Sequence, residues 1–229
     1  MPASIDPTVN YPRIAELAEE FSNHWDKLWA LYIDGAVGFI FVRQHIEGLQ
    51  EIARSYARGT DMDSEAEQDK RIFLYSEILS ENVMLSDIKP AKQGEMKSRN
   101  AINGENFVTL GHSCIVSFYT FWEDYLRREY AIAKGFLSAQ EKDGDKIKNI
   151  LSEKVKSDVW GDLGLFRNSI VHNHGRASSK ISNCKLFKWF NPGDQMLLTP
   201  EHMRLIFLRL LSYRNELFAE QFPPQYMRF

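Results

Sequence analysis

The sequence contains few cysteines and no long apolar run. Cys114 and Cys184 are the only cysteines among 229 residues, too few for a disulfide framework, and no Cys-x-x-Cys pair offers a metal site. The most apolar run, Ala36 to Val42, is far shorter than the roughly 20 residues that a membrane helix requires. The first residues also lack the basic-then-apolar order of a secretory signal peptide. We therefore expect a cytoplasmic protein with buried, reduced cysteines and no membrane contact.

The sequence also lacks the signatures of several enzyme classes and any excess of positive charge. It has no Walker loop, no dinucleotide fingerprint, no His-Glu-x-x-His pair and no Gly-x-Ser-x-Gly elbow. We therefore expect neither a cofactor nor a metal. The net charge of −3 argues against a generally basic nucleic-acid-binding protein, so any RNA site must be local.

Apolar residues recur at helical spacing along most of the chain, which predicts an all-α fold. The widest apolar stripe lies in residues 105–134 and indicates a long central helix. Gly35 and Gly38 are candidates for an interruption between two early helices, and residues 86–104 have the composition of a long loop. The expected helices cover about residues 14–32, 37–56, 64–85, 105–134, 145–156, 158–173 and 200–219.

One region favours strands over helices. Residues 184–190 and 195–198 flank the segment Asn191-Pro-Gly-Asp194, whose central Pro-Gly pair is typical of a type II turn. We therefore expect an antiparallel helical bundle with one small β-hairpin near residues 184–198.

The chemically most informative stretch lies in the expected helix of residues 158–173. Asn168 and His172 are four residues apart and share a face, with Arg167 next to them. Gly175 is a natural end for this helix. A guanidinium, an amide and a titratable imidazole in the last turns suit the handling of a phosphate. The alternative is that these side chains bind the last carbonyls of the helix or pair with a nearby carboxylate.

This Arg-Asn-x-x-x-His pattern resembles the signature of the HEPN superfamily of helical nucleotide-binding domains. The segment from Phe118 to Leu126, Phe-Tyr-Thr-Phe-Trp-Glu-Asp-Tyr-Leu, is similar to a stretch of the preceding long helix in prokaryotic members. The resemblance covers roughly residues 105–220. It implies a HEPN-like helical domain of residues 105–229, with residues 1–104 as an N-terminal helical extension packed on it.

The resemblance implies a metal-independent endoribonuclease, either a toxin or a phage-defence effector, with Arg167, Asn168 and His172 as catalytic residues. In this interpretation Glu123 orients Arg167 or His172 from the facing helix, and His174 is a weaker candidate for an acid or base. Glu123 is equally compatible with a surface ion pair to a neighbouring arginine. The alternative function is a non-catalytic module for binding RNA or nucleotides, or for dimerisation.

The family usually assembles its site between two copies, so the resemblance also implies a homodimer through the motif helix. Gly161 and Gly164 would allow close approach of another helix or of a second chain. A separately encoded antitoxin or defence protein is a further expected partner.

A local excess of positive charge predicts where RNA would bind. From Leu163 to Gly193 the sequence has no Asp or Glu. Aromatic residues alternate with lysines near the end of this stretch, which suits single-stranded nucleic acid, although the alternation also fits a hairpin with one face in the core. The cations expected to contact RNA are Arg176, Lys180, Lys185 and Lys188.

Overall fold

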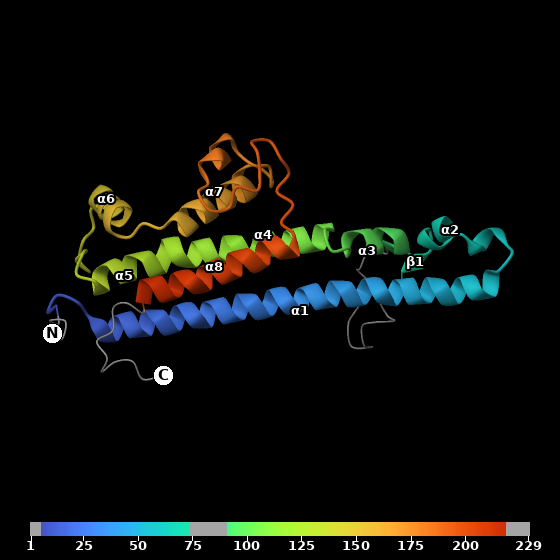
Figure 1. The fold of residues 1–229 in the computed structure, drawn as a ribbon, viewed down its shortest axis with the longest axis horizontal. Helices are drawn as coiled ribbons and strands as arrows, with labels where there is room; N and C mark the ends of the chain where they lie inside the picture. Colours follow the sequence, from blue (N-terminus) through green and yellow to red (C-terminus); the bar gives the residue numbers. More distant parts are fainter. Residues whose placement is uncertain (1–5, 74–90, 219–229) are drawn as a thin grey trace. The chain divides into compact units, whose positions relative to one another are not determined.

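The structure, a computed structural model, describes residues 6–73 and 91–218 (Figure 1). The described residues are predominantly helical and contain one small two-stranded antiparallel sheet. The expected all-α class with a small hairpin is therefore confirmed, although the hairpin lies elsewhere in the chain.

The chain divides into two compact units. The first, here called the motif unit, combines Met1–Leu31 with Gly111–Leu197 and Glu201–Phe229. The second unit consists of Tyr32–Leu110 with Leu198–Pro200. No boundary between the two units lies between residues 104 and 105. The expected domain of residues 105–229 with its N-terminal extension stays a prediction.

Helix α1 runs without interruption from Tyr11 to Ala57, so the expected break near Gly35 and Gly38 does not occur. A β-carbon at Gly35 would lie 2.7 Å from Cδ2 of Leu110, so this glycine makes room for a packed side chain. Among the described residues, nothing lies within 4 Å of the equivalent position at Gly38. Glycine lowers helix propensity by about 1 kcal/mol, which the rest of a 47-residue helix outweighs.

The second unit corrects two sequence predictions. The helix expected over residues 64–85 is α2, Glu65–Asp69, and strand β1, Ile72–Phe73, follows it. The remaining part of that expected helix, residues 74–90, lies outside the described residues. Strand β2, Ala91–Lys92, pairs antiparallel with β1, and the expected loop contains α3, Gln93–Arg99.

Ion pairs explain how these short elements hold together. Lys97 on α3 forms ion pairs with Glu65 at 2.8 Å and Asp69 at 2.7 Å, both on α2. Asp69 also accepts a hydrogen bond from Gln50 on α1. These contacts join residues far apart in the sequence, so no local pattern predicts them. The short 3₁₀ helix η1, Asp61–Asp63, precedes α2.

The long helix expected over residues 105–134 is confirmed as three continuous segments. These are α4, Glu105–Phe121, the π-helical turn η3, Trp122–Leu126, and α5, Arg127–Ala133. The other helices of the motif unit are α6, Gly144–Lys154, α7, Asp158–His172, and α8, Pro200–Phe218, with the 3₁₀ helix η4, Ser179–Asn183, between the last two.

Stacked aromatic rings join three helices of the motif unit. Trp122 in η3 stacks on Trp160 of α7 with ring centroids 4.7 Å apart, and Tyr213 of α8 meets Trp122 edge-on at 5.7 Å. All three side chains are buried. Large aromatic side chains dominate the energetics of a core, so this layer fixes α7 against its neighbours.

The expected hairpin of residues 184–198 does not form. The Asn191–Asp194 turn is present, with Gly193 at φ 89° and Asp194 N–H bonded to the Asn191 carbonyl at 3.1 Å. Within residues 184–198, all of which the structure describes, no strand flanks this turn. The end of the segment pairs instead with residues 175–177. This pairing consists of a bridge between Arg176 and Gln195 and of backbone hydrogen bonds that join Gly175 and Ala177 to residues 193–196.

A buried carboxylate replaces the missing strand partner. Asp162 of α7 is 2% exposed and accepts hydrogen bonds from the backbone N–H groups of Lys185 at 2.8 Å, Leu186 at 2.7 Å and Phe187 at 2.9 Å. Since these backbone donors already bind a side chain, they cannot bond to a second strand. The segment that follows η4 is therefore tied to the motif helix.

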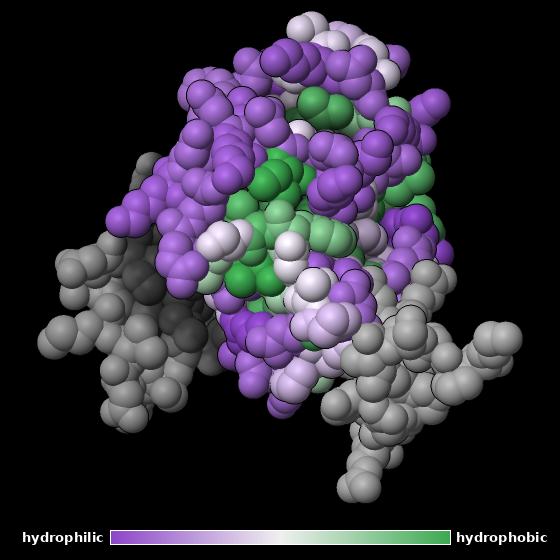
Figure 2. Space-filling model, turned by 90° about the vertical axis from the view of Figure 1, so that its left-hand side faces the viewer, coloured by the Kyte–Doolittle hydropathy of each residue, from purple (hydrophilic) through white to green (hydrophobic). Residues whose placement is uncertain are grey.

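Figure 2 shows the face at the α5 and α6 end, where apolar side chains gather in a limited central area surrounded by hydrophilic ones. In the described residues, no helix is both long and apolar enough to cross a membrane.

Cys114 and Cys184 are buried and unbonded, as expected. Burial raises the pKa of each thiol to about 12.

Candidate active site

The end of α7 is held by hydrogen bonds on both sides of Gly175. Gly175 has φ 74°, and its N–H lies 3.2 Å from the Ser169 carbonyl and 3.3 Å from the Ile170 carbonyl. Ser169 is buried, and its Oγ accepts a hydrogen bond from the N–H of Ser178 at 3.1 Å. His172 lies in the last turn of the helix, as the sequence predicts. The motif is thus displayed on a fixed helix end.

The structure brings the three residues of the motif together. Nη1 of Arg167 donates to Oδ1 of Asn168 at 3.2 Å and contacts Nε2 of His172 at 2.9 Å. Asn168 and His172 are exposed, and Arg167 is half-buried. The guanidinium side chain therefore extends along the surface of α7 between the amide and the imidazole.

The chemistry of the guanidinium sets the direction of the hydrogen bond between Arg167 and His172. A guanidinium can only donate hydrogen bonds, so Nε2 of His172 must accept and the ring proton must lie on Nδ1. The site thus presents a fixed cation beside an imidazole nitrogen that can accept a hydrogen bond. Such a pair can hold a phosphate oxygen and take up a proton close to it.

Glu123 lies in the π-helical turn and forms the ion pair that was the alternative interpretation. Its Oε2 is 3.0 Å from Nη1 of Arg127, one turn along the same helix. Arg127 also donates to the carbonyls of Leu151 and Val155, both at 3.0 Å, at the C-terminal end of α6. The Glu123–Arg127 pair therefore anchors α6 against the long helix.

His174 and Arg176 follow the end of the motif helix. His174 is exposed and has φ 52°, a left-handed conformation that few non-glycine residues adopt. Nη1 of Arg176 lies 3.5 Å from the Gly193 carbonyl, and its backbone carbonyl accepts from the Asn173 side chain. Both residues line the loop beyond His172.

One of the remaining cations expected to bind RNA is paired away from the motif. Lys180 and Lys188 are exposed. Lys185 pairs with Asp158 at 2.7 Å, at the opposite end of α7. Asp158 and His172 are fourteen residues apart, about 21 Å along the helix axis.

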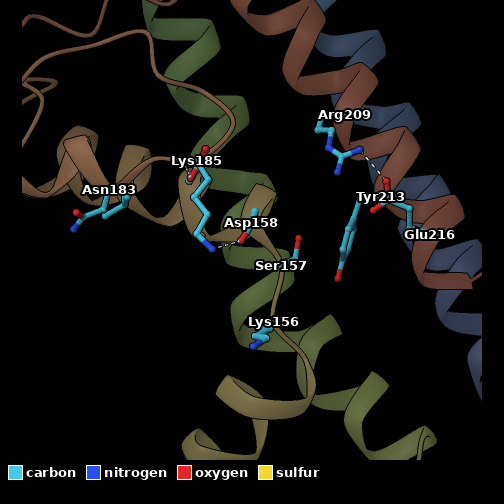
Figure 3. A pocket seen from close by; sticks show the side chains of 11 residues that line it. Lys156, Ser157, Asp158, Asn183, Lys185, Arg209, Tyr213 and Glu216 are labelled. Carbon is cyan, nitrogen blue, oxygen red and sulfur yellow. Dashed lines mark hydrogen bonds and ion pairs between the residues drawn. The ribbon is translucent and has the colours of Figure 1, made fainter.

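Lys185 and Asp158 lie instead at the edge of a separate cleft of about 660 Å³ (Figure 3). Arg209 and Glu216 of α8 line its other side and pair with each other at 2.8 Å. Because the charges of this cleft are largely neutralised by these pairs, it offers no net attraction for an anion.

Three residues near the motif were missed by sequence reasoning. Asp162 carries a weak signal, since it occupies an inward position of an amphipathic helix. Tyr119 of α4 lies against Gly164, and His112 of α4 lies against Gly175, each within about one turn of the motif. The last two belong to a different helix, so no spacing in the sequence links them to α7.

His112 of α4 supports the end of α7 through Met196. Its Nε2 lies 2.9 Å from the Met196 carbonyl, while the N–H of Met196 bonds to the Gly175 carbonyl at 2.8 Å. Burial lowers the pKa of His112, which favours the neutral ring at neutral pH. In the part of the chain that the structure describes, no group of three or more His, Cys, Asp or Glu side chains is arranged to hold a metal ion.

Comparison of the chain with protein-family models, curated proteins and solved structures found no match.

Proposed function

We propose that this protein is a metal-independent endoribonuclease of the HEPN type, acting as a toxin or a phage-defence effector. The observation that supports it most directly is the contact of the Arg167 guanidinium with both Asn168 and His172 on an exposed helix end. The motif side chains bond to one another and face solvent, so a substrate phosphate can reach all three.

The reaction requires a base, an acid and positive charge at the phosphate. The RNA 2′-hydroxyl attacks the adjacent phosphorus, the bond to the 5′-oxygen breaks, and the products carry a 2′,3′-cyclic phosphate and a 5′-hydroxyl. Arg167 would turn from His172 to the phosphate oxygens and stabilise the charge that develops there. This turn frees Nε2 of His172 to accept the 2′ proton, while Asn168 holds the phosphate or orients the imidazole.

One chain supplies one imidazole at the motif, so a second copy would supply the acid that protonates the leaving 5′-oxygen. We therefore propose a homodimer in which the motif helices face each other. Two features support this arrangement. Val171, between Arg167 and His172, is 45% exposed although it is aliphatic. Gly161 has open space where a β-carbon would stand.

The second candidate function is a non-catalytic module that binds RNA or a protein. One observation favours it, namely that Lys185 is committed to an ion pair far from the motif. Fewer cations than expected therefore remain near the motif to hold a long RNA.

Cleavage of a mixed cellular RNA pool in excess EDTA tests the proposal. We expect cleavage by the parent protein that leaves 2′,3′-cyclic phosphate ends, and loss of at least about 100-fold in rate for both His172→Ala and Arg167→Ala. Arg204→Ala is the control, because Arg204 is an exposed arginine that pairs with Glu201 and lies outside the motif.

Three outcomes separate the candidates. Cleavage by the parent and by Arg204→Ala alone supports the ribonuclease. Equal cleavage by every variant would place the activity at another site or in a contaminant. RNA binding without cleavage by any of them would favour the non-catalytic module.

A further inference from the structure

One position on the motif face of α7 is buried although its neighbours are exposed. Gly164, Asn168 and His172 are spaced four residues apart and follow one side of the helix. Asn168 and His172 are exposed, whereas Gly164 is buried. The side chain that covers Gly164 is Tyr119 of α4.

The contact between the phenol and the helix backbone is close. A β-carbon at Gly164 would lie 2.9 Å from Cε2 of Tyr119, 3.1 Å from Cζ and 3.0 Å from the hydroxyl oxygen. Only glycine accommodates a ring edge at this distance. The hydroxyl therefore lies on the motif face, next to Gly164, whose position is about 6 Å along the axis from that of Asn168.

The hydroxyl is available to a ligand. Tyr119 is half-buried, and among the described residues its hydroxyl oxygen is neither sealed from solvent nor hydrogen-bonded. Burial is the main cause that raises the pKa of Tyr119, and Glu123 adds to it, while Arg127 and Arg167 act in the opposite direction. The phenol thus stays protonated and can donate one hydrogen bond.

The ring alone does not explain a tyrosine at this position. Phenylalanine would cover Gly164 equally well, and a buried apolar contact gains nothing from a hydroxyl. The glycine also costs about 1 kcal/mol of helix propensity relative to alanine. Tyrosine and glycine together place a neutral donor in line with the amide and the imidazole of the motif.

We propose that Tyr119 is a substrate-binding residue whose hydroxyl donates to a phosphate of the RNA next to the one held by Arg167. This inference rests on the proposed ribonuclease function. A hydrogen bond to a neighbouring phosphate forms in both the ground state and the transition state. It therefore lowers KM and leaves kcat unchanged.

The test compares Tyr119→Phe with the parent on an RNA oligonucleotide that the parent cleaves in EDTA. We expect KM to rise about 2- to 10-fold with kcat unchanged, since one neutral hydrogen bond is lost. The Kd of the same oligonucleotide with a 2′-deoxy nucleotide at the cleavage position should rise by the same factor. Tyr56→Phe is the control, because Tyr56 is 87% exposed on α1.

The outcomes distinguish this inference from the function on which it rests. Unchanged KM and Kd in Tyr119→Phe, with His172→Ala inactive, would overturn the role of Tyr119 alone. A fall of kcat at constant KM would also overturn it, because the hydroxyl would then not bind the substrate in the ground state. A parent protein that neither binds nor cleaves RNA would overturn both.

If Tyr119→Phe lowers the melting temperature, Gly164→Ala provides the second variant. It keeps the hydroxyl and displaces the ring from the motif face. An increase of KM in Gly164→Ala but not in Gly161→Ala supports the proposal, and equal KM values in both would overturn it.

Discussion

At the scale of single residues, two glycines of α7 have different surroundings. A β-carbon at Gly164 would stand against Tyr119, whereas at Gly161 no atom of the described residues lies within 4 Å. The sequence alone predicted that both glycines allow another helix or chain to approach closely. Within one chain, only Gly164 has such a neighbour.

This difference predicts opposite effects of alanine on stability. Gly161→Ala should raise the free energy of unfolding by about 0.5–1 kcal/mol, because alanine favours the helix. Gly164→Ala gains the same propensity but must displace the Tyr119 ring, which costs about 1–3 kcal/mol, so it should be neutral or destabilising. Urea denaturation of both variants measures this. Equal stabilisation would show that Tyr119 moves freely off the helix.

The contacts of Arg167 with Asn168 and His172 were predictable because the spacing of these residues is local. Arg167, Asn168 and His172 lie within six residues, and helical geometry alone places them near one another. Whether Glu123 would contact the motif or a neighbouring arginine was not predictable, because its carboxylate can pair with a cation in either arrangement. Its pairing with Arg127 depends on where α6 ends.

At the scale of elements, Asp162 links α7 to the segment after η4 by three backbone hydrogen bonds. Asp162→Asn keeps one carbonyl oxygen but replaces the other acceptor with a donor. At least one buried N–H then loses its partner, which costs about 1–3 kcal/mol. We expect this loss of unfolding free energy in urea denaturation.

Asp194→Asn is the matched control for this prediction. Asp194 accepts one backbone hydrogen bond from Asn191, at 2.8 Å, in an exposed turn. Its loss should cost less than about 1 kcal/mol, because water can replace the acceptor. Equal effects of the two substitutions would mean that the buried carboxylate is not a special anchor.

Helices with a strong apolar period were predictable from sequence, and elements set by distant contacts were not. The stripe of residues 105–134 and the start of α8 at Pro200 follow from local pattern and turn chemistry. Strand alternation near residues 184–198 was misleading, because Asp162 takes the backbone donors of Lys185 to Phe187. Helix α3 depends on Lys97 and its partners on α2.

At the scale of the whole molecule, the proposed homodimer predicts a concentration-dependent mass. Val171→Gln replaces an exposed aliphatic side chain on the motif face without adding charge. If the motif helices face each other, light scattering at micromolar concentration should show a dimer for the parent and more monomer for this variant, with slower RNA cleavage.

Leu208→Gln is the control, since Leu208 is 48% exposed on α8 and is also aliphatic. It should leave both the mass and the cleavage rate unchanged. A parent protein that is monomeric at micromolar concentration, or a Val171→Gln protein that stays fully dimeric, would contradict assembly through the motif helix.

Burial of His112, which supports the end of α7, makes the stability of the protein depend on pH. Burial lowers the pKa of His112 in the folded protein, below the value of about 6.5 that an unfolded chain gives. The stability that comes from its neutral ring is therefore complete above about pH 6.5 and is lost as the pH falls through the lower folded value. Because His112 binds Met196, which in turn holds Gly175, a proton taken up there acts on the end of α7. Acid would thus weaken the helix end that carries the motif through a buried histidine that is not part of the motif.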